Sequence, residues 1–208
     1  MLISRRSILF APFASIQLED WVAADASPFP HSSWRIEDGC LKSIGGLPTF
    51  QDIKTVKLYN DFEFSFEWRM QKAGNSGVKY QLERWDKWQP KGLEGFHIRA
   101  RGPELQLVDD NDNPDAQKGP LKQCGSLYGK IAATHKAKIR INEFNSARLT
   151  KRGLAVEHWI NDELLVSYKL DTSLPSAIAL QNHACDVWFR NLDITALPAT
   201  QMPHTPPR

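Results

Sequence analysis

The sequence predicts an all-β protein built as an antiparallel sandwich or jelly roll. From about residue 34 onward, short segments that alternate polar and apolar residues recur at fairly regular spacing, with turn residues between them. The clearest is DFEFSFEW, whose apolar face carries Phe62, Phe64, Phe66 and Trp68. No segment of good length shows the 3.6-residue period of a helix. Strands with one apolar face are typical of two packed sheets.

The predicted strands follow one another along the chain. Asp38-Gly39 makes a hairpin turn within IEDGCLKSI, and the turn AGNSG links DFEFSFEW to VKYQLER. Later strands are expected in FHIRAR, ELQLVD, AKIRI, SARLTKR, LAVEHWIN, ELLVSYKL, AIALQN and VWFRNLDITAL. Residues 83–95 and 109–129 interrupt this rhythm as long polar insertions, which in a compact β domain are usually functional or mobile.

Length and composition indicate one domain. A sandwich of 208 residues is commonly a single domain, and we place it at residues 18–197. Residues 198–208 are Pro-rich and are expected to be a disordered tail. The net charge of +2 argues against a nucleic-acid partner, and no apolar run is long enough to predict a membrane span. The three cysteines lack metal-binding spacing and are expected to be buried free thiols, with one disulfide as the alternative. The sequence does not indicate an oligomeric state.

The N-terminus carries a targeting pattern. Arg5 and Arg6 precede the short apolar run SILFAPF, and SRRSIL resembles a twin-arginine export signal. We therefore expect residues 1–17 to be a short export signal, or otherwise a disordered N-terminus. An export signal predicts an extracytoplasmic bacterial protein, either periplasmic or secreted.

ELQLVD is the most distinctive polar segment. A regular strand would place Glu104 and Gln106 on one face, and a β-bulge near Val108 would bring Asp109 to that same face. Two carboxylates about 5 Å apart support retaining glycoside chemistry, and a single desolvated carboxylate can serve as a general base. The alternative is an ordinary solvated face.

Other segments supply further candidates for binding a sugar. The turn AGNSG and the strand after it carry Asn75 and Lys79, and the insertion at residues 83–95 carries two tryptophans that can serve as platforms for sugar rings. His158 in EHWIN can reach a cleft if Trp159 faces the core. The complete set of predicted substrate-binding residues is Asn75, Lys79, Gln106, Trp85, Trp88, Gln181, His183 and Arg190.

The acidic segment DDNDNPDA leaves a metal site open. Its oxygen-rich side chains suit a hard cation such as Ca²⁺, but the spacing of a calcium loop is missing, and an acidic turn begun by Asn113-Pro114 is the alternative. No cofactor is firmly predicted, and a divalent metal, Ca²⁺ among them, stays open.

Several segments in this order resemble the bacterial family of 3-keto-disaccharide hydrolase domains, formerly a domain of unknown function. The matching segments run from about Leu18 to Leu197 and are WRIEDGCL, DFEFSFEWR, GNSGVKY, GPELQLVDD with NPDA, LYG, VEHWIN, IALQNH and VWFRNLDI. The resemblance implies a concanavalin A-like jelly roll of two antiparallel sheets. It also implies a glycoside-cleaving enzyme whose substrate is a sugar already oxidised at C3.

A mechanism follows from the keto group. The ketone makes the C2 hydrogen acidic, so a base can form an enediolate that expels the C1 substituent, after which water adds back. Glu104 or His158 is the hypothetical base. Lys79, His183 or a bound metal would stabilise the oxyanion, and Asp109 would orient a partner.

Two other readings compete with this one. Glu104, Gln106 and Asp109 echo the acidic row of retaining β-glucanases, although Gln106 replaces an acid there and the shorter Asp109 would lengthen the separation between the carboxylates. A non-catalytic carbohydrate-binding module is the second alternative, because tryptophans and amides suffice for binding.

Overall fold

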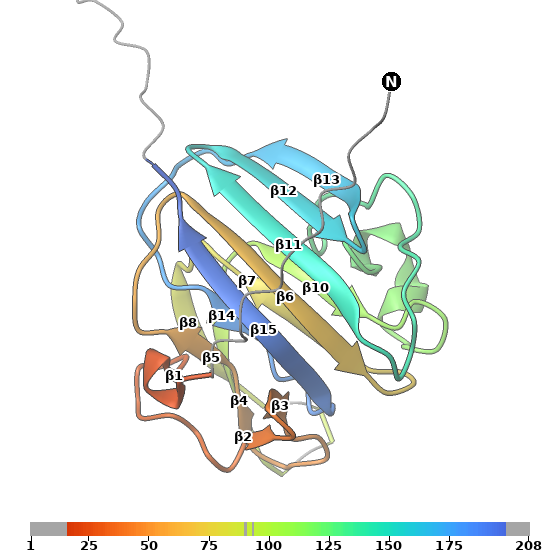
Figure 1. The fold of residues 1–208 in the computed structure, drawn as a ribbon. Coiled ribbons are helices and arrows are strands. Elements are labelled where there is room, and N and C mark those ends of the chain that lie inside the picture. Colours follow the sequence, from red (N-terminus) through yellow and green to blue (C-terminus); the bar gives the residue numbers. More distant parts are fainter. Residues whose placement is uncertain (1–15, 90, 93, 199–208) are drawn as a thin grey trace, which may run out of the picture.

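The computed structural model describes residues 16–89, 91–92 and 94–198. In this part of the chain two antiparallel sheets lie face to face, and a small third sheet packs at one end (Figure 1). The arrangement confirms the predicted all-β sandwich. The export signal expected at residues 1–17 and the tail expected at residues 198–208 lie almost wholly outside the described residues.

The five-stranded sheet carries the candidate site. Its strand order is β1-β5-β14-β7-β10, and every neighbouring pair is antiparallel. The bounds, in that order, are Trp21–Ala23, Ile53–Thr55, Ala179–Leu180, Asn75–Lys79 and Glu104–Val108.

The seven-stranded sheet faces the viewer in Figure 1 and has the order β13-β12-β11-β6-β15-β3-β2. The bounds, in that order, are Glu163–Lys169, Ala155–Ile160, Asn145–Arg152, Phe62–Met70, Val187–Ala196, Cys40–Ser43 and Trp34–Glu37. The long central strands β6, β11 and β15 form the middle of this sheet, which is the back of the sandwich.

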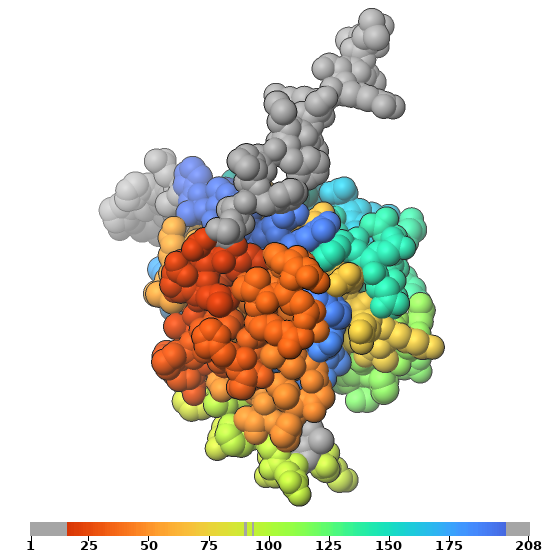
Figure 2. Space-filling view, turned by 60° about the horizontal axis from the view of Figure 1, so that its bottom comes forward, coloured from red at the N-terminus to blue at the C-terminus, as the bar shows by residue number. Residues whose placement is uncertain are grey.

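The third sheet joins β4 (Phe50–Gln51), β9 (His97–Arg101) and β8 (Arg84–Trp88). Ile98 and Ala100 of β9 pack on Ala179 of β14, so this sheet lies over the outer face of the five-stranded sheet. Figure 2 turns the bottom of Figure 1 forward and shows the yellow-green segment around β8 projecting beyond the orange N-terminal strands. Short 3-10 turns at Leu18–Asp20, Ala116–Lys118 and Pro120–Lys122 complete the elements.

The core fills the space between the two large sheets. Along β6 every second residue is buried, as the alternation in DFEFSFEW predicted. Phe64 lies opposite Leu149 of β11, while Val78 and Leu105 face inward from the other sheet, and all four are fully buried. Burying one such side chain contributes about 1.5–3 kcal/mol, so this layer is the main source of stability.

Three sequence predictions differ from the structure. Residues 137–141 (AKIRI) form no strand, because the Asn145 side chain bonds both the N–H and the carbonyl of Arg140 and holds that segment as a loop. The strand expected in VKYQLER ends at Lys79, and Gln81 adopts a left-handed φ of 48°. The insertion at residues 83–95 contains a true strand, β8, paired with β9.

The cysteines are free, as expected.

None of the helical segments in the described part of the chain has the length and apolar character that a membrane-spanning helix requires.

We expect Leu149→Ala to lower the free energy of unfolding by about 2–5 kcal/mol, because it opens a cavity between the sheets. Leu58→Ala is the matched control, since Leu58 is 59% exposed and its truncation should change stability by less than about 0.5 kcal/mol. Urea denaturation of both variants measures the difference. Similar losses in the two would contradict this assignment of the core.

Candidate active site

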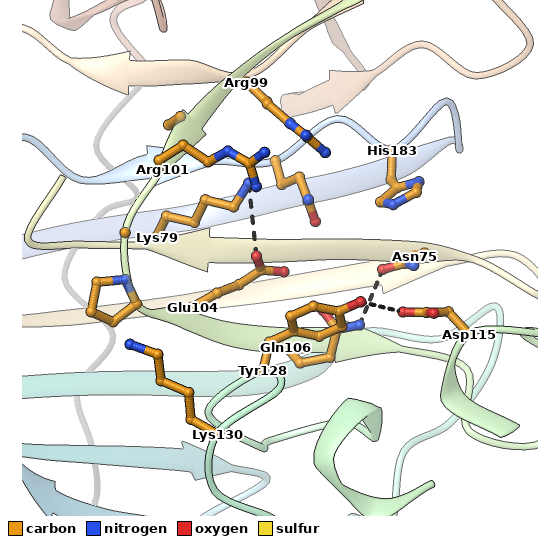
Figure 3. Close-up of a pocket in the computed structure, with 14 residues that line it drawn as sticks. Asn75, Lys79, Arg99, Arg101, Glu104, Gln106, Asp115, Tyr128, Lys130 and His183 are labelled. Carbon is orange, nitrogen blue, oxygen red and sulfur yellow. Dashed lines mark hydrogen bonds and ion pairs between the residues drawn. The ribbon is translucent and has the colours of Figure 1, made fainter. Parts of the chain in front are cut away.

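A polar cavity of about 180 Å³ opens on the outer face of the five-stranded sheet (Figure 3). Strands β7 and β10 form its floor, β9 forms one wall, and the segment after β10 forms another. The residues just after β14 complete the rim. The cavity therefore combines segments that lie far apart in the sequence.

The floor is set by the register of β7 and β10. Glu104 pairs with Lys79, and Gln106 pairs with Gly77. The side chains of Glu104, Gln106 and Lys79 therefore share the outward face of the sheet. Leu105, between them, points into the core and is fully buried. The predicted placement of Glu104 and Gln106 on one face is confirmed, and Asn75 and Lys79 line the same cavity.

Asp109 does not join this row, and the predicted bulge near Val108 is absent. Strands β7 and β10 stay in regular register through Val108, so Asp109 keeps the parity of the core-facing residues. Its carboxylate is buried and accepts hydrogen bonds from Ala73 N at 2.9 Å and Asn111 N at 3.1 Å. Asp109 therefore holds the turns at the end of the floor and does not line the cavity.

Glu104 is the carboxylate at the centre of the floor (Figure 3). Its Oε2 lies 3.7 Å from Lys79 Nζ. When the amides of Gln106 and Gln181 are oriented to satisfy both their ends, each nitrogen donates to Glu104 Oε1, at 3.0 and 3.3 Å. Burial nevertheless raises the pKa of Glu104, because the loss of hydration outweighs the attraction of Lys79.

A second carboxylate, that of Asp52, lies beneath Lys79, and no local sequence pattern predicts it. Asp52 is fully buried and accepts from Lys79 Nζ at 3.2 Å and from His97 Nε2 at 2.8 Å. The backbone N–H groups of Ala100 and Asn182 donate to it as well, both at 3.0 Å. Burial opposes ionisation, but Lys79 and His97 overcome it and lower the pKa of Asp52. Lys79 is thus held between two carboxylates.

The wall formed by β9 presents Arg99 and Arg101 (Figure 3). Asp86 of β8 lies opposite Arg99 in the register and receives hydrogen bonds from both Nε atoms, at 2.7 and 2.6 Å. Partial burial acts against ionisation, yet the two arginines lower the pKa of Asp86. No sequence pattern predicts a role for these two arginines, because FHIRAR has the alternation of an ordinary strand.

The wall after β10 presents Asp115, Tyr128 and Lys130. The Tyr128 hydroxyl donates to Asp115 Oδ2 at 2.7 Å, and the lysines at 118 and 122 contact Oδ1. Burial alone would raise the pKa of Asp115, but these partners outweigh it and lower the pKa to about 2. Asp115 is therefore a fixed anion at neutral pH. The long polar insertion was predicted to be functional, and this part of it does line the cavity.

His183 and Gln181, which follow β14, also line the cavity, so the motif LQNH reaches the site as predicted. His183 lies exposed at the rim, with its ring centroid 6.4 Å from that of the buried His97. Of the predicted residues, the structure therefore gathers Asn75, Lys79, Glu104, Gln106, Gln181 and His183 around one cavity.

His158 and Arg190 lie elsewhere. His158 is fully buried between the sheets, where Nδ1 donates to Gly125 O at 3.2 Å and Nε2 accepts from the Tyr80 hydroxyl at 2.7 Å. Arg190 binds Glu67 at 2.6 Å, on the outward, polar face of β6. His158 reached the core because the neighbouring tyrosine satisfies its polar ring, whereas the sequence suggested Trp159 for the inward position.

The two tryptophans of β8 do not line the cavity itself. Trp85 is 47% exposed and Trp88 is 37% exposed, so both remain available at the surface. Trp88 stacks against Arg99, whose guanidinium carbon lies 4.6 Å from the ring centroid. Trp88 therefore contacts the cavity wall through Arg99.

In the acidic segment DDNDNPDA, side-chain oxygens accept hydrogen bonds from backbone N–H groups. Asp110 accepts from Cys124 N at 2.7 Å, and Asn113 Oδ1 accepts from Asp115 N at 2.9 Å. Across the described part of the chain, no group of three or more His, Cys, Asp or Glu side chains is placed to hold a metal ion.

A polar cavity of carboxylates, amides and cations on one sheet face of a sandwich is the kind of site that suits the binding and cleavage of a carbohydrate. A model of the 3-keto-alpha-glucoside-1,2-lyase-like domain matches residues 13–195. A 3-keto-disaccharide hydrolase of Bacteroides thetaiotaomicron is 31% identical over 207 residues, covering 80% of this chain and 71% of that protein. The chain belongs to the 3-keto-alpha-glucoside-1,2-lyase-like domain family, which confirms the resemblance seen in the sequence.

Solved structures agree on the fold. A proposed glycosyl hydrolase from Parabacteroides distasonis superposes with a TM-score of 0.72 at 24% identity, covering 89% of this chain and 92% of that one. The carbohydrate-binding module CBM66 from Bacillus subtilis superposes with a TM-score of 0.52 at 11% identity, covering 89% of this chain and 100% of that one. The same sandwich thus serves proteins of both kinds, and the site must decide the function.

Gly77 leaves room for Glu104 on the floor. A Cβ at residue 77 would lie 2.6 Å from Glu104 Oε1, so Gly77→Ala should push the flexible carboxylate toward solvent. We expect the pKa of Glu104 to fall toward its usual value while the melting temperature changes little, because only a side-chain end must move. Carboxyl-carbon NMR titration and thermal melting measure the two effects. An unchanged titration of Glu104 would contradict this account.

His158 makes stability depend on pH. Burial lowers its pKa to about 4 from an unfolded value of about 6.5, so the unfolded chain binds the extra proton between these values. Stability should be fully present above pH 6.5 and fall by about 3 kcal/mol as the pH drops to 4. His158→Gln should reduce this slope, whereas His31→Gln at the exposed His31 should leave it unchanged. Urea denaturation across this pH range provides the measurement.

Proposed function

We propose that the protein cleaves 3-keto-glycosides, 3-keto-disaccharides among them, by removing the C2 proton and eliminating the C1 substituent. The observation that carries the proposal is the pairing of a buried carboxylate of raised pKa, Glu104, with the Lys79 ammonium on the floor of a polar cavity. Membership of the family supports the choice of a keto-sugar as the substrate.

The reaction needs few groups. The base takes the proton from C2, and the electron pair of that C–H bond moves into the enediolate conjugated with the C3 oxygen. The enediolate then expels the C1 oxygen, which takes up a proton as it leaves, and water adds to the unsaturated sugar. A base, a cation for the C3 oxygen and a proton donor for the leaving oxygen are the whole requirement.

Glu104 is the proposed base. Its raised pKa brings its basicity closer to that needed to remove a proton near neutral pH, and a single carboxylate of this kind is sufficient. Its carboxylate is held from several sides by Lys79 and the two glutamine amides, which fixes its direction. His158, the other base considered from the sequence, lies in the core.

Lys79 is the proposed stabiliser of the C3 oxyanion. Asp52 anchors its ammonium group from beneath, so the charge is in place before the oxyanion forms. His183 at the rim is the proposed proton donor for the leaving oxygen, because the Tyr128 hydroxyl on the wall after β10 already donates to Asp115. Because Asp52 already holds the Lys79 ammonium group in position, no reorganisation of that charge is needed when the oxyanion forms.

The retaining β-glucanase alternative is weakened by the position of Asp109. That chemistry needs a second carboxylate about 5 Å from the first, and Asp109 instead caps backbone N–H groups outside the cavity. A carbohydrate-binding role without catalysis keeps one observation in its favour, the two exposed tryptophans of β8.

We also propose that the protein acts outside the cytoplasm, as the twin-arginine-like N-terminus suggests. Fractionation of a bacterium that expresses the full chain tests this. Recovery of the chain only in the cytoplasm would contradict it.

Glu104→Gln should lower the cleavage of a 3-keto-glucoside by roughly 10²–10⁴-fold, because the amide cannot accept the C2 proton. Exchange of the C2 proton with deuterated solvent should fall in parallel. The unoxidised parent glucoside is the control and should not be cleaved by the wild type. Full C2 exchange in the variant would exclude Glu104 as the base, and cleavage of the parent sugar would favour the glucanase reading.

The rate of the wild type should rise with pH through the raised pKa of Glu104, because only the ionised carboxylate is a base. The pH profile of kcat/KM measures this, and a profile without a titrating base would contradict the role. Repeating the cleavage assay with EDTA tests whether the reaction requires a bound metal. Binding of the keto-glucoside without cleavage would indicate a carbohydrate-binding module.

A further inference from the structure

The wall formed by β9 concentrates positive charge beside the floor. Arg99 and Arg101 both bind the same carboxylate, that of Asp86, with Nε–Oδ distances of 2.7 and 2.6 Å. One carboxylate cannot neutralise two guanidinium groups, so the cluster keeps a net positive charge. Lys130, on the wall after β10, is exposed and adds another positive charge to the cavity.

The neighbouring acids offset this charge only in part. Asp115 on the opposite side contacts two lysines of its own, Lys118 and Lys122, at 2.8 and 2.9 Å. On the floor two carboxylates, Asp52 and Glu104, face the single ammonium group of Lys79, so there the carboxylates outnumber the ammonium groups. Both walls therefore carry more cations than acids, and the β9 wall is the one whose cations are arginines.

The guanidinium group of Arg99 is also fixed in place and has donors to spare. Its carbon lies 4.6 Å from the Trp88 ring centroid, and its side chain is 21% exposed. Its Nε binds Asp86, and among the described residues neither terminal nitrogen has a protein partner. An arginine held in this way loses little freedom when it binds an oxyanion through its terminal nitrogens.

A neutral sugar does not require such a wall. Sugar hydroxyls are satisfied by single hydrogen bonds to amides, and the amide of Asn75 lines the cavity in addition to the Gln106 and Gln181 amides that hold Glu104. The reacting C3 oxygen is served by Lys79. The paired arginines therefore fit a charged group on the part of the substrate that extends beyond the reacting ring.

We propose that the preferred substrate carries an oxyanion, such as a carboxylate, on the group attached at C1, and that Arg99 and Arg101 bind it. This inference rests on the proposed function, because it names the substrate class of the same site. The alternative is that the arginines serve only to hold β8 to β9 through Asp86.

The test compares two 3-keto-glucosides of the same shape. One carries 4-(hydroxymethyl)benzoate at C1 and the other carries 4-(hydroxymethyl)benzamide, so that they differ in charge far from the breaking bond, and both anomers of each are used. The wild type should give a kcat/KM at least about tenfold higher for the benzoate, since charge-assisted hydrogen bonds are roughly twice as strong as neutral ones. Added salt should narrow this ratio.

Variants locate the preference. Arg99→Gln and Arg101→Gln should each lower the benzoate-to-benzamide ratio severalfold, while Arg99→Lys should keep part of it. Arg148→Gln is the matched control, because Arg148 is a half-exposed arginine of β11 on the other sheet, stacked on Trp159. Thermal melting of each variant identifies loss of folding.

The outcomes are distinguishable. Equal kcat/KM values for the two substrates, or equal losses on both in the Gln variants, would overturn the oxyanion site and leave the proposed function intact. Cleavage of neither substrate would overturn the proposed function. In that case calorimetric binding of the two unoxidised glucosides still decides the inference: tighter binding of the benzoate that is lost in Arg99→Gln supports it, and equal binding overturns it.

Discussion

The buried carboxylate of Asp52 is the interaction on which the site depends. It accepts two side-chain donors, from Lys79 and His97, and two backbone N–H groups, from Ala100 and Asn182. These donors come from β7, from β9 and from the segment after β14. A buried charge is tolerated only when it is fully paired, so the carboxylate stabilises these segments only when all of them are in place together. The floor, one wall and the rim of the cavity are therefore positioned by a single group.

The same arrangement divides two carboxylates into different roles. Asp52 and Glu104 both approach Lys79, yet the pKa of Asp52 is lowered and that of Glu104 is raised. Asp52 has His97 and two backbone donors in addition to the lysine, whereas burial dominates at Glu104. Different environments push the pKa values of the two carboxylates apart. One site thereby obtains both a permanent anion, Asp52, and a usable base, Glu104. Gly77 contributes by leaving the space that Glu104 occupies.

Reaction and recognition are built on separate parts of the fold. The proposed cation, Lys79, and the proposed base, Glu104, stand on the neighbouring strands β7 and β10 of the five-stranded sheet. Arg99, Arg101 and Trp88 stand on the small sheet of β8 and β9, which packs onto the sandwich through a few apolar side chains and is tied to it by the bonds of His97 and Ala100 to Asp52. A wall of this kind can change its charge without disturbing the floor, so related proteins with the same chemistry are free to differ in the group they accept beyond the reacting ring.

The sequence alone determined the all-β class and the shared face of Glu104 and Gln106, because both follow from the two-residue period of a strand. The resemblance of its sequence segments to known proteins identified the family to which the chain belongs. Tertiary structure alone decided the rest of the site. Asp109 turned out to be a cap because the register of β7 and β10 continues without a bulge. Asp52 and Arg99 carried no local signal, since their partners lie tens of residues away or on another strand. Such long-range pairings depend on sheet order and burial, which no local pattern contains.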